Sequence, residues 1–250
     1  MQLETVREQL KQLRLPVASE QLEEILSRKK VRGEFSWLSE LLSTELDARK
    51  ENAIERRIKK ANFPERRTLE QFNWSFNKKI DQRKIESLST CKFIENNEIA
   101  LLLGNAGTGK THCAIAIGLL AAQQGHAVFC TSVKRLSQRI RLAKERNTLD
   151  LLFKQILTSK LWILDDWGVV TMPRDVSEEI FDLFDRRKYS SAMLLTSNRA
   201  VEEWPQVFSD PILANAAIDR MFENANIILF EGPSYRMKGR IIMPEVDNEK

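Results

Sequence analysis

The stretch Leu101–Gly125, LLLGNAGTGKTHCAIAIGLLAAQQG, decides the fold of this 250-residue chain. An apolar run ends at Gly104, and Gly109, Lys110 and Thr111 begin five residues later. This spacing matches the phosphate-binding loop G-x-x-x-x-G-K-[S/T]. The apolar run before the loop predicts a short buried strand, and the alanine-rich run after it predicts a helix of good helix formers. The loop is therefore predicted to lie between a strand and a helix, as phosphate binding requires.

The chemistry of the loop residues predicts how they act. Glycines let the backbone curl so that its N–H groups point at phosphate oxygens, and the helix start adds the positive end of a dipole. We expect Lys110 to reach the β- and γ-phosphates of a nucleotide and Thr111 to hold Mg²⁺. The predicted nucleotide-binding residues of the loop are Gly104, Asn105, Ala106, Gly107, Thr108, Gly109, Lys110 and Thr111.

The composition narrows the class of protein. With 42% hydrophobic and 30% charged residues, the chain reads as an ordinary globular protein. Its apolar runs are too short to cross a bilayer, and its N-terminus has no signal-peptide core. We therefore expect a cytoplasmic protein with no membrane partner. The three cysteines form no C-x-x-C pair, so neither a disulfide framework nor a zinc site is indicated.

The chain contains two regions with different patterns of apolar residues. Residues 1–61 carry apolar residues at helical spacing, with Ser19 as the expected cap of the second helix. After an aromatic-rich connector at 68–77 and one helix at 82–95, short apolar segments alternate with helical ones, which predicts an α/β domain with a mainly parallel sheet. The expected domains are a helical domain at 1–65 and an α/β domain at 66–250. The expected strands are Ile99–Leu103, Ala127–Thr131, Leu161–Leu164, Met193–Thr196 and Ile227–Phe230.

Polar residues follow two of these strands. The segment KLWILDDWG, 160–168, ends a strand with Asp165 and Asp166, and strand ends of a parallel sheet face its ligand crevice. We expect Asp165 to contact Mg²⁺ through water and Asp166 to act as the base or water-positioning group. The strand in AMLLTSNR, 192–199, leads to Asn198, whose amide is expected to sense the γ-phosphate and hold the attacking water.

Basic residues indicate an anionic partner. The net charge is +4, but residues 49–92 hold 13 Lys and Arg against 6 Asp and Glu, a local 13 − 6 = +7. Two stretches are candidates for DNA contact, with a solvated helix face as the alternative. No base-reading motif is visible, so the contacts should go mostly to phosphates and be weakly sequence-specific. The candidates are Arg56, Arg57, Lys59, Lys60, Arg66 and Arg67 in the first stretch and Lys134, Arg135, Arg139, Arg141, Lys144 and Arg146 in the second, where the helical register buries Leu136, Ile140 and Leu142–Ala143.

A late arginine completes the order of elements. Arg220 precedes the last strand, where it could act in trans on the ATP of a neighbouring subunit as an arginine finger. The order of loop, aspartate pair, asparagine and late arginine resembles the AAA+ class of ATPases. The segments 61–74, 93–118, 195–221 and 232–240 resemble more closely the IstB family of transposition helper ATPases, relatives of the DnaC helicase loaders. The resemblance covers nearly the whole chain.

The resemblance implies a fold and a function. The fold would be an α/β AAA+ P-loop NTPase, with a parallel sheet flanked by helices, preceded by a small all-α N-terminal domain. The function would be ATP hydrolysis with Mg²⁺ by a homo-oligomer that assembles with ATP on double-stranded DNA, as a ring or a filament, and stimulates a transposase.

Two departures from the family pattern stand out. The family usually has Asp-Glu where this chain has Asp165–Asp166, and the shorter side chain predicts slow hydrolysis or a shifted water. Only 250 − 220 = 30 residues follow Arg220, which leaves no room for the C-terminal helical lid of many AAA+ proteins. Arg236 is the expected substitute for the arginine that such a lid supplies to the nucleotide.

Two other functions remain open at this point. A helicase loader of the DnaC kind would bind single-stranded DNA, with its N-terminal helices on a helicase. A small-molecule kinase would share the P-loop, but no lid of catalytic arginines is evident and the basic helical extension would have no task. The segments AAIDR, 216–220, and ANFPERRTLEQF, 61–72, favour the transposition helper.

Overall fold

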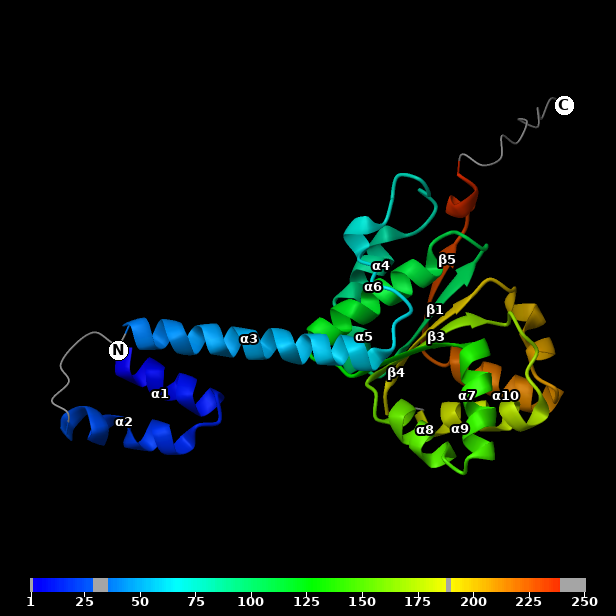
Figure 1. The fold of residues 1–250 in the computed structure, drawn as a ribbon. Helices are drawn as coiled ribbons and strands as arrows, with labels where there is room; N and C mark the ends of the chain where they lie inside the picture. Colours follow the sequence, from blue (N-terminus) through cyan, green and yellow to red (C-terminus); the bar gives the residue numbers. More distant parts are fainter. Residues whose placement is uncertain (1, 29–35, 188–189, 239–250) are drawn as a thin grey trace. The chain divides into compact units, whose positions relative to one another are not determined.

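The computed structural model describes residues 2–28, 36–187 and 190–238 (Figure 1). The chain divides into two compact units, Met1–Arg56 and Arg57–Lys250. The division falls inside the long helix α3 (Ser36–Ala61), so residue 65, the expected boundary, lies within the second unit. The end of the family resemblance, at 239–240, lies outside the described residues.

The first unit is a small helical unit. It contains α1 (Gln2–Gln12), α2 (Pro16–Arg28) and most of α3. The expectation that Ser19 caps α2 is wrong, because the helix begins at Pro16, and proline suits a first helical position since it lacks the N–H that would be unpaired there. Ser19 is instead buried and donates its hydroxyl to the Arg7 carbonyl at 3.2 Å. The buried core of the unit consists of Val6, Leu10, Leu13 and Leu42.

The second unit is built on a five-stranded parallel sheet with strand order β2-β3-β4-β1-β5. All five predicted strands are confirmed, with ends that differ by at most three residues from those expected. Their carboxyl ends lie at one edge of the sheet, because every neighbouring pair is parallel. The strands are β1 (Ile99–Gly104), β2 (Val128–Ser132), β3 (Leu161–Trp167), β4 (Ala192–Ser197) and β5 (Ala225–Phe230).

Helices cover both faces of this sheet (Figure 1). One face carries α6 (Lys110–Gln123) with the shorter α4 (Gln82–Ser89) and α5 (Lys92–Glu95). Gly118 allows α6 to lie close to β3, since a Cβ there would come within 2.5 Å of Ile163 Cδ1. The other face is covered by α7 (Val133–Glu145), α8 (Leu149–Leu157), α9 (Arg174–Arg187) and α10 (Pro211–Phe222), and their apolar sides share one core cluster.

Two expectations about the helices are wrong. The segment 82–95 is two helices rather than one, because Cys91 between α4 and α5 has a φ of 62°, which breaks the helical path. In α7, Leu136, Ile140 and Ala143 are buried as predicted, but Leu142 is 47% exposed.

The described residues that follow β5 form little regular structure. After β5 the described residues form only the short 3₁₀ turn η3 (Tyr235–Met237), so they contain no helical lid. Among the described helices, none combines the length and the apolar character needed to span a bilayer.

Candidate active site

The phosphate-binding loop connects β1 to α6 and relies on glycine. Gly104, Gly107 and Gly109 have φ values of 137°, 78° and 105°, which side chains other than glycine rarely adopt. A Cβ at Gly104 would collide with the Phe230 carbonyl, and one at Gly109 would collide with the Phe72 ring. The loop can therefore keep this path only with glycine at these positions.

Lys110, the first residue of α6, points back into the loop. Its Nζ donates to the carbonyl oxygens of Gly104 at 2.7 Å and Asn105 at 2.6 Å. Burial lowers the pKa of Lys110 to about 8, although the carboxylates of Asp166 and Asp165 partly oppose this effect. Phosphate oxygens at the loop would offer this ammonium group the negative charge that carbonyl oxygens lack.

Thr111 and Asp165 meet beside the loop. The Thr111 hydroxyl donates to Asp165 Oδ1 at 2.9 Å, which joins the start of α6 to the end of β3. Both groups are hard oxygen donors, and Mg²⁺ is usually held by one or two such groups together with substrate phosphates and water. The described residues contain no cluster of three or more His, Cys, Asp and Glu side chains that could cage a metal without a ligand. The pair therefore fits Mg²⁺ bound together with a nucleotide.

Asp166 lies at the exposed rim of the same edge. Its φ is 59°, a left-handed conformation that aspartate tolerates better than most residues. Partial burial and the adjacent Asp165 carboxylate raise the pKa of Asp166, while Arg236 and Lys110 oppose that rise. A carboxylate with a raised pKa is a better proton acceptor, which suits a general base.

A pocket of about 420 Å³ lies at the carboxyl edge of the sheet. It brings together predicted site residues from four separate segments: Ala106, Gly107, Thr108, Gly109, Lys110 and Thr111 of the loop and helix start, with Asp166, Asn198 and Arg236. A second pocket, of about 240 Å³, contains Asp165 and shares Thr111 and Asp166 with the first. Thr111 and Asp166 therefore line both pockets, whereas Asp165 lines only the smaller one, which also reaches Arg135 on α7.

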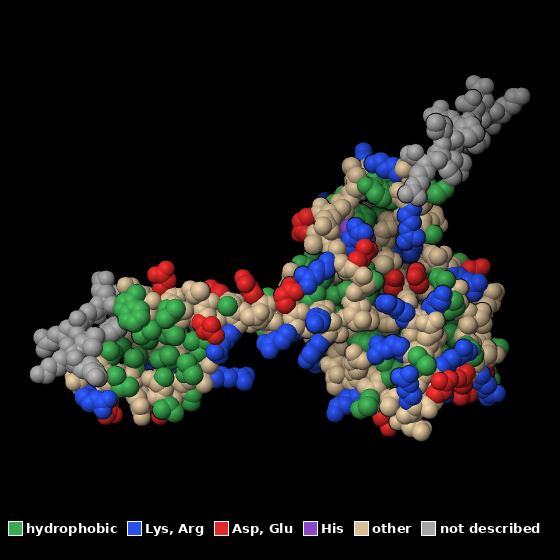
Figure 2. Space-filling view, in the orientation of Figure 1, with side chains coloured by type: hydrophobic (Ala, Val, Ile, Leu, Met, Phe, Trp, Pro, Cys, Tyr) green, Lys and Arg blue, Asp and Glu red, His purple; other side chains and the backbone are tan. Residues whose placement is uncertain are grey.

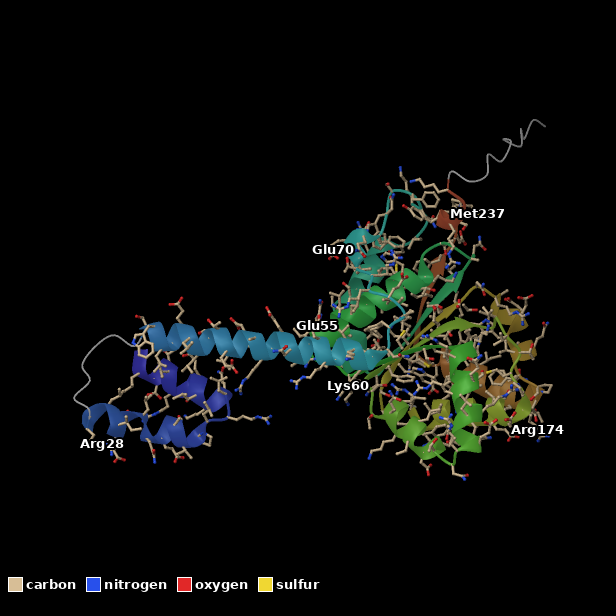
Figure 3. All side chains as sticks on the ribbon, viewed as in Figure 1. Arg28, Glu55, Lys60, Glu70, Arg174 and Met237 are labelled. Carbon is tan, nitrogen blue, oxygen red and sulfur yellow. The ribbon has the colours of Figure 1, made fainter. Side chains whose placement is uncertain are left out.

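One wall of the larger pocket was not predicted. The connector between α3 and α4 folds over the loop, and His112 Nε2 lies 2.8 Å from the Thr68 carbonyl oxygen. Phe72 packs edge-on against His112 at 5.3 Å, and Phe76 packs edge-on against Tyr235 at 4.9 Å. Glu70 and Met237 mark the connector and η3 in Figure 3. The only sequence feature that could have indicated this wall is the aromatic richness of residues 68–77, which alone predicts a connector. The connector residues that line the pocket are Glu65, Arg67, Gln71, Phe72, Asn73, Phe76 and Asn77.

Arg220 lies at the opposite edge of the sheet from the loop. It lies in the last turn of α10 and lines a pocket of about 550 Å³ with the first residues of β1 and β5. Its guanidinium pairs with Asp185 of α9 at 2.8 Å and lies over the Phe181 ring at 4.7 Å. Arg220 therefore does not join the nucleotide pocket of its own chain.

In the first basic stretch, Arg67 pairs with Glu65 at 2.8 Å, and another arginine bonds the end of a helix. Arg57 donates to the Ala122 carbonyl near the C-terminus of α6 at 2.8 Å, a common way to satisfy the last carbonyls of a helix. Arg56 bonds the Asn52 carbonyl of its own helix at 3.2 Å, and its side chain stays exposed. Lys59 and Lys60 are also exposed, and Figure 3 labels Lys60 near the end of α3.

The second basic stretch also contains both cations that have partners within the chain and cations that are exposed. Arg139 lies 5.2 Å from the centre of the Phe129 ring and donates to Gln155 at 2.7 Å, and Lys144 pairs with Glu179 at 2.7 Å. Lys134 and Arg135 are exposed at the start of α7. Figure 2 shows Lys and Arg side chains over the visible face of the second unit.

Together, the parallel sheet, the glycine loop and the carboxylates at the strand ends give the chain the P-loop fold of the AAA+ class. The chain belongs to the family of IstB-like ATP binding proteins, whose sequence pattern it matches over residues 8–242. It is therefore a member of an ATP-binding family of insertion sequences.

Curated relatives agree with this assignment. The chain is 34% identical to an ATP-binding protein of insertion sequence IS21 from Pseudomonas aeruginosa, over 95% of this chain and 89% of that protein. It is 29% identical to the ATP-binding protein of insertion sequence IS5376 from Geobacillus stearothermophilus, over 99% of both chains.

Solved structures share the fold. AMPPCP-bound DnaA from Aquifex aeolicus superposes with a TM-score of 0.58 at 20% identity, over 71% of this chain and 54% of that one. The DnaC helicase loader superposes with a TM-score of 0.52 at 18% identity, over 70% of this chain and 99% of that one. At these identities the likeness concerns the fold alone.

Proposed function

We propose that this protein is a Mg²⁺-dependent ATPase that assembles on double-stranded DNA and assists the transposase of its insertion sequence. One observation carries the proposal: the loop, the aspartates and Asn198 converge at one edge of the sheet, while Arg220 lies at the other. A single chain thus holds a nearly complete hydrolytic site and, on its far side, the arginine that a neighbouring copy would need.

The phosphate end of the pocket supports the chemistry of hydrolysis. Lys110 would exchange its two carbonyl partners for β- and γ-phosphate oxygens, and Thr111 and Asp165 would hold the cation. Bound Mg²⁺ would neutralise charge that develops on the phosphates. Asp166 would take a proton from the attacking water, which Asn198 would orient, and the γ-phosphate would leave as inorganic phosphate with ADP remaining.

The base end of the pocket supports a purine nucleotide. Phe72, Phe76 and Tyr235 supply flat apolar surfaces, and Asn73 supplies an amide group within the same lining. A nucleobase stacks on aromatic rings and hydrogen-bonds with amides. DnaA, which shares the fold, was solved with the adenine nucleotide AMPPCP bound. We propose ATP as the nucleotide of this chain because its family is one of ATP binding proteins.

Exposed cations support contact with DNA phosphates. Lys59, Lys60, Lys134 and Arg135 are exposed, and none of them has a structural role comparable to that of Arg57 or Arg139 among the described contacts. Since Arg135 also lines the cavity beside Asp165 and Asp166, DNA bound at α7 would lie close to the hydrolytic site.

The experiment is an ATPase assay of the purified chain with and without double-stranded DNA, followed by a transposition assay with the transposase of the same element. We expect Mg²⁺-dependent turnover and ATP-dependent assembly on duplex DNA, both lost in Lys110→Ala. Stable preference for single-stranded DNA together with binding to a helicase would instead favour the loader function. Absence of turnover under all these conditions would contradict the proposal.

A further inference from the structure

The two aspartates of the site stand on an irregularity of the sheet. In the pairing of β3 with β4, Leu164 lies opposite Leu195 and Trp167 lies opposite Ser197. Two residues of β3, Asp165 and Asp166, therefore face one residue of β4, Thr196. Such a bulge re-aims side chains and is frequent beside active sites.

A single hydroxyl group joins both aspartates across this bulge. Thr196 Oγ1 donates to Asp165 Oδ1 at 2.5 Å and accepts the backbone N–H of Asp166 at 3.0 Å. A threonine hydroxyl has one proton to donate and can accept at the same time, so both bonds can form together. Thr196 is only 1% exposed, and water therefore has little access to compete for these bonds.

The bonds fix what each carboxylate can offer. Asp165 Oδ1 receives the hydroxyls of both Thr111 and Thr196, so its second oxygen is the one available to a hydrated cation. The bond to the Asp166 N–H anchors a peptide whose φ is 59°, which aspartate adopts less readily than ordinary backbone conformations. Loss of the hydroxyl would free the Asp165 side chain and the Asp166 backbone at the same time.

We propose that Thr196 is a positioning residue that sets the Asp165 carboxylate for the cation and the Asp166 carboxylate for the attacking water. This inference rests on the proposed ATPase function, because the cation and the water belong to that reaction. Thr196 itself touches neither of them.

The alternative is that Thr196 merely stabilises the sheet. Ser177 provides the comparison, because its buried hydroxyl bonds the carbonyl oxygens of Met172 at 3.4 Å and Pro173 at 3.1 Å. Ser177→Ala removes a buried hydroxyl without touching either aspartate. Its loss should lower the melting temperature and leave the site unchanged.

The test measures ATP affinity twice, in excess Mg²⁺ and in a chelator, for the wild-type chain, Thr196→Val, Thr196→Ser and Ser177→Ala. The ratio of the two affinities is the gain that Mg²⁺ provides. Thr196→Val keeps a similar shape but lacks the hydroxyl, so we expect unchanged affinity in chelator and a gain reduced roughly 10- to 100-fold, as for other groups that orient metal ligands. Thr196→Ser should restore the gain, and Ser177→Ala should retain it.

An unchanged gain in Thr196→Val, or a gain lost equally in Thr196→Ser, would overturn the proposal. If Thr196→Val does not fold, the test rests on Thr196→Ser. That variant keeps the hydroxyl, so its affinity gain from Mg²⁺ must match that of the wild-type chain. A wild-type chain whose ATP affinity ignores Mg²⁺ would also overturn it. Turnover measured in parallel separates the two proposals. An inactive wild-type chain with an intact Mg²⁺ gain contradicts the ATPase function and the role of Thr196 toward the attacking water, but not its role in setting Asp165 for the cation.

Discussion

Lys110 makes nucleotide binding sensitive to pH. Its pKa in the free protein is about 8, and bound phosphates would raise that pKa because they favour the charged amine. Linkage then gives full ATP affinity below about pH 8 and weaker affinity above it, by up to about tenfold per pH unit until the pKa of the complex is reached. Titrations of ATP affinity between acid and alkaline pH would measure this. Lys110→Arg keeps its charge over that range, so any binding that it retains should be flat above pH 8.

Asp166 can be tested with a substitution that its backbone accepts. Asparagine also tolerates positive φ, so Asp166→Asn should preserve the fold and ATP binding. It cannot accept a proton from water, and we expect turnover to fall by roughly 10²- to 10⁴-fold. Single-turnover kinetics with bound ATP would measure the loss. Normal turnover in this variant would mean that another group activates the water.

At the scale of elements, one buried arginine connects three of them. Arg187 at the end of α9 is 4% exposed, and its guanidinium bonds the Ile156 carbonyl of α8, Ser159 and the Ala192 carbonyl of β4. Burial lowers its pKa to about 10. Arg187→Met would remove these charged hydrogen bonds, which contribute about 1.5–3 kcal/mol each, so the free energy of unfolding should fall by at least about 2 kcal/mol. Urea denaturation would measure it, with the exposed Arg174→Met as control.

The elements also explain what sequence could predict. The five strands were predictable because each contains a short apolar run, which the structure buries in β1, β3 and β4 at the centre of the sheet. The loop was predictable because its glycine spacing is specific. The pocket wall at 68–77 was not, since its role depends on the packing of Phe72 on His112 from a distant helix. Arg57 and Arg139 are predicted DNA contacts because their charge is visible in the sequence. The sequence does not show that Arg57 bonds the Ala122 carbonyl and Arg139 the Gln155 amide.

At the scale of the molecule, DNA binding should depend on salt through the exposed cations. Each phosphate contact contributes roughly 0.9 to the slope of log K against log salt on duplex DNA. Lys134→Glu with Arg135→Glu should therefore weaken binding and reduce that slope by about two contacts' worth, or roughly 1.8. Lys154→Glu changes an exposed cation on α8 and serves as the control. An unchanged slope would place the contact elsewhere, first at Lys59 and Lys60.

Assembly would bring Arg220 of one chain to the loop of another, because Arg220 and the loop lie at opposite edges of the sheet in each chain. In a head-to-tail assembly of copies, each Arg220 could meet the nucleotide of the next chain, and the contact would repeat as a ring or filament. Arg220 must then leave Asp185, but a pair whose side chains are 27% and 53% exposed is worth only about 0–1 kcal/mol, so a γ-phosphate can displace it.

Mixing two inactive variants tests this directly. Arg220→Ala should bind ATP as a lone chain but neither assemble on DNA nor hydrolyse, whereas Lys110→Ala should fail to bind ATP. A mixture contains interfaces at which an intact Arg220 faces an intact loop, so turnover should reappear and reach a maximum at intermediate ratios. Asp185→Ala mixed with Lys110→Ala provides the control, because that variant keeps both Arg220 and the loop. Assembly and normal turnover by Arg220→Ala alone would reduce Arg220 to the structural partner of Asp185.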